Sequence, residues 1–159
     1  MTPTIRFATA ADAELIVRFI RGLAEYEHAT DSVAATPQLI RAQLEQPQPP
    51  FECLIAECGG EAVGFALFFS NYSTWRGRAG LYLDDLFVLE RYRRHGVGKA
   101  LFRRLAQLAM ERGWTRMEWS VRDRNRLAQG FYRKRGAGPK DEWTVWRLDG
   151  EALAKTARD

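Results

Sequence analysis

The feature that most constrains this chain is an almost continuous apolar stretch, residues 80–89, that runs directly into a glycine turn and an amphipathic helix. Its apolar side chains include Leu81, Leu83, Leu86, Phe87 and Val88. So continuous a run is typical of a strand in the middle of a sheet rather than at its edge. From residue 96 to about residue 112 the apolar residues recur at helical spacing, and Gly113 marks the end of that helix. The pattern predicts an α/β fold in which a buried strand leads into a helix.

The rest of the chain supplies partners for this unit. Further strands are predicted at residues 4–8, 51–57, 61–72, 116–121 and 142–148. Further helices are predicted at residues 10–27, 37–45 and 126–135. Gly59 and Gly60 supply the positive φ of a tight turn, so the two strands that flank them should pair antiparallel. The order of elements predicts one domain, residues 1–159, with a mixed and mostly antiparallel central sheet flanked by helices.

Composition limits the classes of protein to which the chain can belong. With 159 residues, of which 46% are apolar, the chain is long enough to close one core without metals or disulfides. It has no apolar window of the roughly 18 to 20 residues that a membrane span requires, and we expect no secretory leader after Met1, because Arg6, Asp12 and Glu14 interrupt any apolar run there. The only two thiols, Cys53 and Cys58, lie in predicted strand. We therefore expect a soluble protein of the reducing cytoplasm that uses no metal and no membrane.

The turn before the central helix carries a dense group of basic and glycine residues. It reads Arg93, Arg94, His95, Gly96, Val97, Gly98 and Lys99. The first-turn N–H groups of a helix lack intrahelical partners and the helix dipole makes that end electropositive, so a pyrophosphate fits there. Glycines let phosphate oxygens approach the main chain, and basic side chains add charge-assisted hydrogen bonds. The spacing matches neither a Walker A loop nor the three-glycine dinucleotide fingerprint, which indicates a phosphorylated cofactor of another kind.

A second group of residues lies on the helix predicted at 126–135. Ala128, Phe131 and Tyr132 share one face of that helix by the three-and-four rule, and Asn125 precedes it. The phenol of Tyr132 is a candidate proton donor, while a Phe-Tyr pair on a helix is also typical of core packing. The residues alone leave both interpretations open.

Both groups resemble the motifs of one family. Residues 93–98 resemble the Arg/Gln-x-x-Gly-x-Gly/Ala signature of the GNAT superfamily of N-acetyltransferases, and residues 125–132 resemble its later Asn-x-x-Ala-x-x-Phe-Tyr motif. Over nearly the whole chain, the sequence is similar to the diamine (spermidine/spermine) and thialysine N-acetyltransferases. That similarity is carried by residues 24–27, 73–78, 81–88 and 131–137. The resemblance implies the GNAT fold, direct transfer of an acetyl group to a primary amine of a small molecule in a ternary complex, and a homodimer.

By position, the resemblance implies a site for acetyl-CoA as cosubstrate. The residues that it implies there are Leu86, Phe87, Val88, Arg93, Arg94, His95, Gly96, Val97, Gly98, Lys99, Asn125, Ala128, Tyr132 and Arg135. Main-chain groups of residues 86–88 would pair with the pantetheine arm, and residues 94–99 would hold the pyrophosphate. Tyr132 would be the general acid, because a departing thiolate with a pKa of about 8.5 gains from a phenol with a pKa of about 10.

The resemblance also implies a site for the acceptor amine. Its residues would be Tyr26, Glu27, Asp84, Glu118, Trp119, Ser120 and Glu142. An alkylamine, with a pKa of about 10.4, must lose a proton before it attacks, and Asp84 is the candidate base, acting through water. Asp85 is the alternative if the strand bulges. Arg122 and Arg124 depart from the pattern of the relatives and would oppose a polycationic acceptor.

Two other functions are compatible with these residues. The basic patch at residues 91–104 would suit a module that binds nucleic acid or another anion. The same fold would also serve a catalytically silent regulator that binds coenzyme A. The basic residues gather at one helix N-terminus rather than along a groove, and the tryptophans show no platform spacing, so we expect no nucleic-acid partner. The presence of Tyr132 favours an enzyme over a silent regulator.

Overall fold

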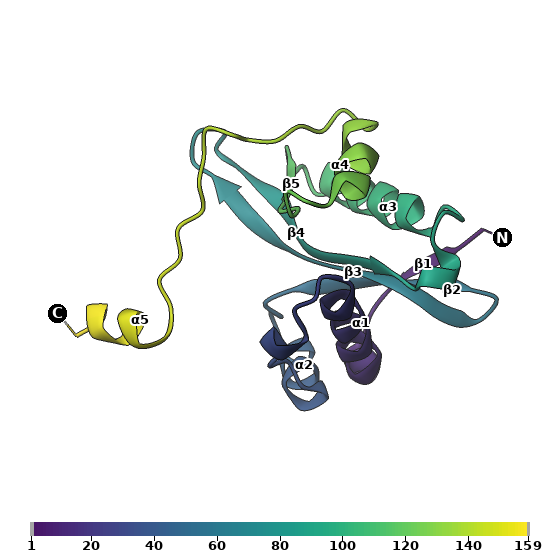
Figure 1. Ribbon diagram of the computed structural model, residues 1–159, viewed down its shortest axis with the longest axis horizontal. Helices are drawn as coiled ribbons and strands as arrows, with labels where there is room; N and C mark the ends of the chain where they lie inside the picture. The colour runs from purple at the N-terminus through teal and green to yellow at the C-terminus, as the bar shows by residue number, and fades with distance from the viewer. Residues whose placement is uncertain (1, 159) are drawn as a thin grey trace. The chain divides into compact units, whose positions relative to one another are not determined.

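A computed structural model describes residues 2–158 of the chain (Figure 1). These residues divide into two compact units, one through Ser120 and one from Val121 onward. The strands of the sheet are β1 (Thr4–Phe7), β2 (Glu52–Cys58), β3 (Glu61–Ser73), β4 (Arg78–Val88) and β5 (Met117–Trp119). The helices are α1 (Ala13–Tyr26), α2 (Pro37–Leu44), α3 (Val97–Glu111), α4 (Arg126–Arg133) and α5 (Gly150–Thr156). Short 3-10 turns are η1 (Ala10–Asp12), η2 (Thr30–Ser32) and η3 (Glu90–Tyr92). None of the helices formed by residues 2–158 combines the length and the apolar character needed to cross a bilayer.

The sheet of the first unit is mixed, as predicted. Its strand order is β1-β2-β3-β4-β5, with antiparallel pairing throughout except for the parallel β4–β5 pair. The turn between β2 and β3 uses positive φ at both Gly59 and Gly60, which confirms the predicted hairpin. β4 lies between β3 and β5, the interior position that its continuous apolar sequence predicts.

One core lies between the sheet and α1 with α2. Ala13, Ile16, Val17 and Phe19 of α1 are buried, and they recur at the helical spacing that the sequence shows. They pack with Ile40 of α2 and with side chains of β2, β3 and β4. The Thr36 hydroxyl caps α2 by accepting from the Leu39 N–H at 3.2 Å.

The other face of the sheet is covered by α3 (Figure 1). The buried side chains of α3 are Val97, Leu101, Phe102, Leu105, Leu108 and Ala109. Phe102 meets Trp119 of β5 edge to face, with ring centroids 5.2 Å apart. Gly113 has a φ of +68°, so the helix ends at the residue that the sequence indicates.

The second unit departs from the prediction. Residues 142–148 form no strand, and α5, which the sequence analysis did not predict, follows them. The alternating pattern there has no face to bury, because Val145 is 86% exposed and Trp146 is 92% exposed. A strand also needs a neighbour to satisfy its backbone N–H and C=O groups. β5 is likewise shorter than the predicted 116–121, since its ladder with β4 spans three residue pairs only.

Candidate active site

β4 and β5, the two strands at the centre of the site, pair in parallel over three residue pairs and then separate. Leu81 pairs with Met117, Tyr82 with Glu118 and Leu83 with Trp119. β4 continues to Val88 beyond this point, and no other strand of the described chain pairs with that edge. Main-chain donors and acceptors of residues 84–88 therefore border an opening in the sheet.

A β-bulge in β4 lies at the same point. Leu67 of β3 is opposite Asp85, and Phe68 is opposite Leu83, so Asp84 is an extra residue without a partner in the ladder. Asp85 therefore shares the face of Leu67, the face that packs against α1, while Asp84 is exposed. The sequence made Asp85 the alternative functional carboxylate if the strand bulges. β4 does bulge, at Asp84.

The two carboxyl groups differ in acidity. Partial desolvation of its carboxyl group raises the pKa of Asp84 above the ordinary value, although the residue as a whole is exposed. Burial, followed by the negative charges of Asp84 and Glu27, raises the pKa of Asp85 to about 6. A carboxyl group with a pKa near neutrality can exchange protons with a reacting group at physiological pH.

The turn before α3 has the geometry of an anion-binding site. Gly96 is the N-cap of α3 with a φ of +85°, a left-handed conformation that a residue with a Cβ rarely adopts. A Cβ placed on Gly96 would meet no atom of the described chain, and one on Gly98 would meet only Leu86 and Val88 at 3.9 Å. The first turn of α3 contains no acidic side chain. An anion can thus reach the N–H groups of this turn without steric or charge opposition.

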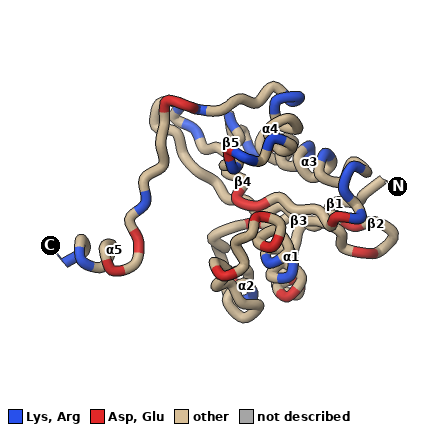
Figure 2. The backbone as a smooth tube through the Cα atoms, in the orientation of Figure 1, with Lys and Arg blue, Asp and Glu red and all other residues tan. Residues whose placement is uncertain are grey.

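The basic side chains of this turn fall into two groups. Arg94, which has a φ of +66°, and Lys99 have no hydrogen-bond or ion-pair partner among residues 2–158, so both are available to an anion. His95 is instead held by its Nδ1, which lies 2.7 Å from the Arg93 carbonyl oxygen. Figure 2 shows the basic residues gathered at the start of α3 and the acidic pair on β4.

The Arg93 side chain contacts β4 and the end of α1. Its Nε donates to the Val88 carbonyl oxygen at 2.9 Å. Its guanidinium carbon lies 4.7 Å from the centre of the Tyr26 ring and 5.6 Å from that of the Phe87 ring. The structure thus places one predicted coenzyme residue against a predicted acceptor residue.

Tyr26 and Glu27 form the C-terminal end of α1. Tyr26 is 45% exposed, and Glu27 is the C-cap residue that follows it. The negative charge of Glu27, like that of Asp84, contributes to the raised pKa of Asp85. Glu27 and Asp84, two of the predicted acceptor residues, thus act electrostatically on one carboxyl group, that of Asp85.

The acceptor residues predicted on β5 have different environments. Glu118 accepts a hydrogen bond from Asn71 Nδ2 at 3.2 Å, and its Oε1 lies 2.8 Å from Arg116 Nε. Trp119 packs on α3 through Phe102. The Ser120 hydroxyl lies 3.1 Å from the hydroxyl of Tyr82.

Sequence reasoning missed the partners of these residues. Arg116 and Glu118 are two apart in the strand predicted at 116–121, which puts them on the same face, so their ion pair was open to prediction. Tyr82 and Asn71 come from other strands. Their contacts with β5 depend on the register of the sheet, which the sequence does not display.

The second unit carries the other predicted residues. The Asn125 side chain caps α4 by accepting from the Ala128 N–H at 3.1 Å. Burial raises the pKa of Tyr132, and the nearby positive charge of Arg135 opposes that rise. Arg135 lies over the Phe131 ring and donates to the Phe131 carbonyl oxygen at 2.6 Å. Glu142 is exposed and forms a 2.9 Å ion pair with Lys140.

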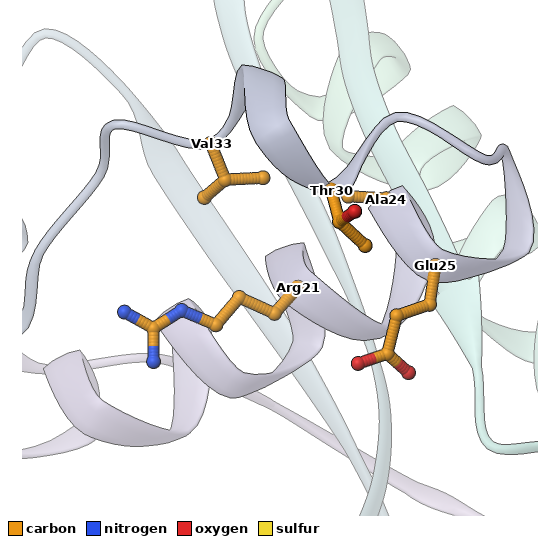
Figure 3. A pocket seen from close by; sticks show the side chains of 5 residues that line it. All are labelled: Arg21, Ala24, Glu25, Thr30 and Val33. Atoms are coloured by element: carbon orange, nitrogen blue, oxygen red, sulfur yellow. The ribbon is translucent and has the colours of Figure 1, made fainter.

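Two other features do not belong to the site. A pocket between α1 and η2 is lined by Arg21, Ala24, Glu25, Thr30 and Val33, none of which is a predicted site residue (Figure 3). The two thiols, Cys53 and Cys58, are free and buried. Burial raises the pKa of Cys53 far above its ordinary value, which makes it a poor nucleophile.

Comparison with known proteins identifies relatives of this chain in both sequence and fold. The model of the acetyltransferase (GNAT) family matches residues 17–137. A thialysine N-epsilon-acetyltransferase of Bos taurus is 35% identical over 164 aligned positions, which cover 96% of each chain. A spermidine/spermine N(1)-acetyltransferase-like protein 1 of Homo sapiens is 31% identical over 96% of this chain and 23% of its own. A solved integron cassette protein from the mobile metagenome of V. cholerae has the same fold, with a TM-score of 0.81, 24% identity, and coverage of 100% of this chain and 99% of its own.

Proposed function

The chain belongs to the acetyltransferase (GNAT) family, and from that premise we propose that it transfers an acetyl group from acetyl-CoA to a primary amine of a small molecule. One observation carries the proposal. β4 bears the carboxyl pair Asp84 and Asp85 at its bulge, and the same strand leads through η3 into the anion-binding turn of α3. A carboxyl pair and a phosphate-binding turn on one strand suit a reaction between a cationic acceptor and an anionic donor.

The turn of α3 fits the pyrophosphate of the coenzyme. Gly96 and Gly98 leave open space above the N–H groups of the helix, and Arg94 and Lys99 add free positive charge. The edge of β4 at residues 86–88 pairs with no strand on this side and could offer main-chain groups to the amides of the pantetheine arm, although the Val88 carbonyl oxygen also accepts from Arg93. Acetyl-CoA supplies the acetyl group as a thioester, with a thiolate as the leaving group.

The carboxyl pair would take the proton that the amine loses before attack. A base works best when its pKa lies near the operating pH, and the pKa of Asp85, about 6, meets that condition. Asp84 is the more exposed of the two and lies at the bulge, where a water or the amine itself can reach it. We therefore assign proton acceptance to the pair, with Glu27 as the third negative charge that attracts the ammonium form of the acceptor.

Tyr132 would protonate the departing thiolate. Burial keeps its pKa above the ordinary value for a phenol, so the hydroxyl retains its proton at neutral pH. Asn125 and Ala128, which define the start of α4, would border the thiol end of the coenzyme. This assignment is supported by the motif of residues 125–132.

The acceptor class follows from the same charges. A primary amine on a flexible chain, as in a diamine, a polyamine or a thialysine-like amino acid, would present an ammonium group to Glu27, Asp84 and Asp85. The names of the relatives from Bos taurus and Homo sapiens support these acceptors. The family resemblance also supports a homodimer, and the free, buried cysteines suit a reducing cytoplasm.

Calorimetry with acetyl-CoA, followed by an acceptor screen, tests the proposal. Coenzyme A should bind, and thiol release should depend on an added primary amine, with thialysine and spermidine as the first probes. Binding of single-stranded DNA with strong salt dependence, without binding of coenzyme A, would instead identify an anion-binding module. Binding of coenzyme A without transfer to any amine would identify a silent regulator.

A further inference from the structure

The Arg93 side chain lies at the junction between the coenzyme turn and the end of α1. Its backbone belongs to the segment that leads into α3, where its N–H donates to the Glu90 carbonyl oxygen at 3.0 Å. Its guanidinium faces Tyr26, the last residue of α1, across a distance of 4.7 Å. Because the Nε donates to the Val88 carbonyl oxygen, the orientation of the guanidinium plane is restricted.

A series of aromatic contacts supports this arrangement from within the core. Phe65 stacks on Phe19 at 5.5 Å, Phe19 meets Phe87 at 6.1 Å, and the guanidinium of Arg93 lies 5.6 Å from the Phe87 ring. Gly22 of α1 permits this packing, because a Cβ there would lie 2.9 Å from the Phe87 ring. The Phe87 ring therefore meets α1 at Phe19 and Gly22, and the Arg93 guanidinium meets it at Tyr26.

The segment that Arg93 contacts carries acceptor-side residues. Tyr26 is followed directly by Glu27, and His28 then has a φ of +56°, a left-handed conformation in the turn that ends the helix. A shift of Tyr26 would move Glu27 relative to Asp85. Arg94, the next residue along, has no such contact and is free to meet an anion.

We propose that Arg93 is a positioning residue for the acceptor amine, which acts by fixing Tyr26 and the turn that carries Glu27, and that it is not a ligand of the coenzyme phosphates. This inference rests on the proposed acetyl transfer for its kinetic consequence. Its structural part, the contact between Arg93 and Tyr26, stands independently. The adjacent arginines thus divide two tasks, with Arg94 on the donor side and Arg93 on the acceptor side.

The test compares Arg93→Lys with Arg94→Gln. Arg93→Lys keeps the charge but loses the planar guanidinium, so we expect the KM of the acceptor to rise about tenfold, the size of one well-ordered cation–π contact. We expect kcat to stay within about threefold and the Kd of coenzyme A within about twofold, which separates positioning from a general loss of structure. Arg94→Gln should do the reverse, weakening coenzyme A about fivefold or more with little change in the KM of the acceptor.

Tyr26 supplies the matched partner for a double-mutant cycle. Tyr26→Leu removes the ring face and should reproduce the rise in acceptor KM that we expect for Arg93→Lys. The double variant Arg93→Lys with Tyr26→Leu should be no worse than Tyr26→Leu alone, because both changes remove the same contact. Full additivity would overturn the proposal, as would an Arg93→Lys protein with weakened coenzyme A and normal acceptor KM.

Hydrogen exchange gives a readout that needs no activity. In the protein without ligands, Arg93→Lys should speed exchange of the amides of residues 25–29, and Arg94→Gln should not. Unchanged exchange in that segment would remove the positioning role. If the wild type acetylates no amine, the proposed function fails, and the exchange experiment still decides whether Arg93 holds the end of α1.

Discussion

Asp85 lies opposite Leu67 in the ladder between β3 and β4, whereas the adjacent Asp84 has no partner there. This single break in register turns the Asp85 side chain toward the face covered by α1 and leaves Asp84 at the surface. Two neighbouring carboxyl groups of the same chemistry thereby acquire different environments. The proton chemistry that we propose depends on that difference.

Asp85→Asn should stabilise the fold at neutral pH. Because the folded-state pKa of Asp85, about 6, lies above its ordinary value of 3.8, the folded protein holds this proton more tightly than the unfolded chain. The stability associated with Asp85 is full below about pH 4 and falls as the pH rises through 6. Removing the carboxylate should therefore raise the free energy of unfolding by about 1–2 kcal/mol at pH 8, allowing for partial exposure, and by almost nothing at pH 3.5.

Urea unfolding of the wild type and of Asp85→Asn at several pH values measures this difference. Asp84→Asn is the matched control, and its effect should be smaller because Asp84 is more exposed. A difference between wild type and Asp85→Asn that does not vary with pH would contradict the raised pKa.

The two carboxyl variants should also separate the base from its neighbour. If Asp85 accepts the proton, kcat/KM for the acceptor should fall as the pH drops below about 6, which gives the pH–rate profile an acid limb. Asp85→Asn should lower the rate by about 10²-fold or more and abolish that acid limb. Asp84→Asn should shift the limb to lower pH, because the charge of Asp84 contributes to the raised pKa of Asp85. Steady-state rates across pH 5 to 9 decide the matter, and a limb retained in Asp85→Asn would transfer the role to Asp84.

Gly96→Ala and Gly98→Ala should distinguish strain from steric exclusion at the coenzyme turn. Gly96 has a φ of +85°, so Ala there should cost about 1 kcal/mol of stability and also weaken coenzyme A. Gly98 has ordinary contacts at 3.9 Å, so Ala there should leave the melting temperature unchanged and still raise the Kd of coenzyme A about tenfold. Calorimetry and thermal unfolding report the two effects separately. Gly130→Ala, on α4 where an added Cβ would meet no atom within 4 Å, is a control that should alter neither the turn nor coenzyme affinity.

Tyr132→Phe should lower kcat by about 10²-fold with the Kd of coenzyme A within about twofold, because only the proton donor is removed. Since burial raises the pKa of Tyr132, the wild-type rate should show no loss of this donor between pH 7 and 9. Tyr72→Phe, at a tyrosine that is 63% exposed, is the control for removing a phenol. A normal kcat in Tyr132→Phe would remove the tyrosine from the reaction.

Local patterns predicted most of the fold of the first unit. The continuous apolar sequence of β4, the helical spacing of α3 and the Gly59-Gly60 turn each specify a conformation from neighbouring residues alone. The prediction of a strand at 142–148 was wrong, because alternation indicates only that a strand is feasible. Whether it forms depends on a pairing partner, which the pattern of these residues does not identify.

The same division applies to the candidate site. The order of residues was enough to place a carboxyl pair on a buried strand and a glycine turn at a helix N-terminus, because both depend on short spacings. Which carboxyl group turns inward depended on β3, through the register break at Leu67 and Phe68. The direction of Arg93 depended on Tyr26 and Phe87, which are brought beside it only when α1 packs on the sheet. A sequence specifies the chemistry that each position can supply, whereas long-range packing selects the environment that sets each pKa and each side-chain contact.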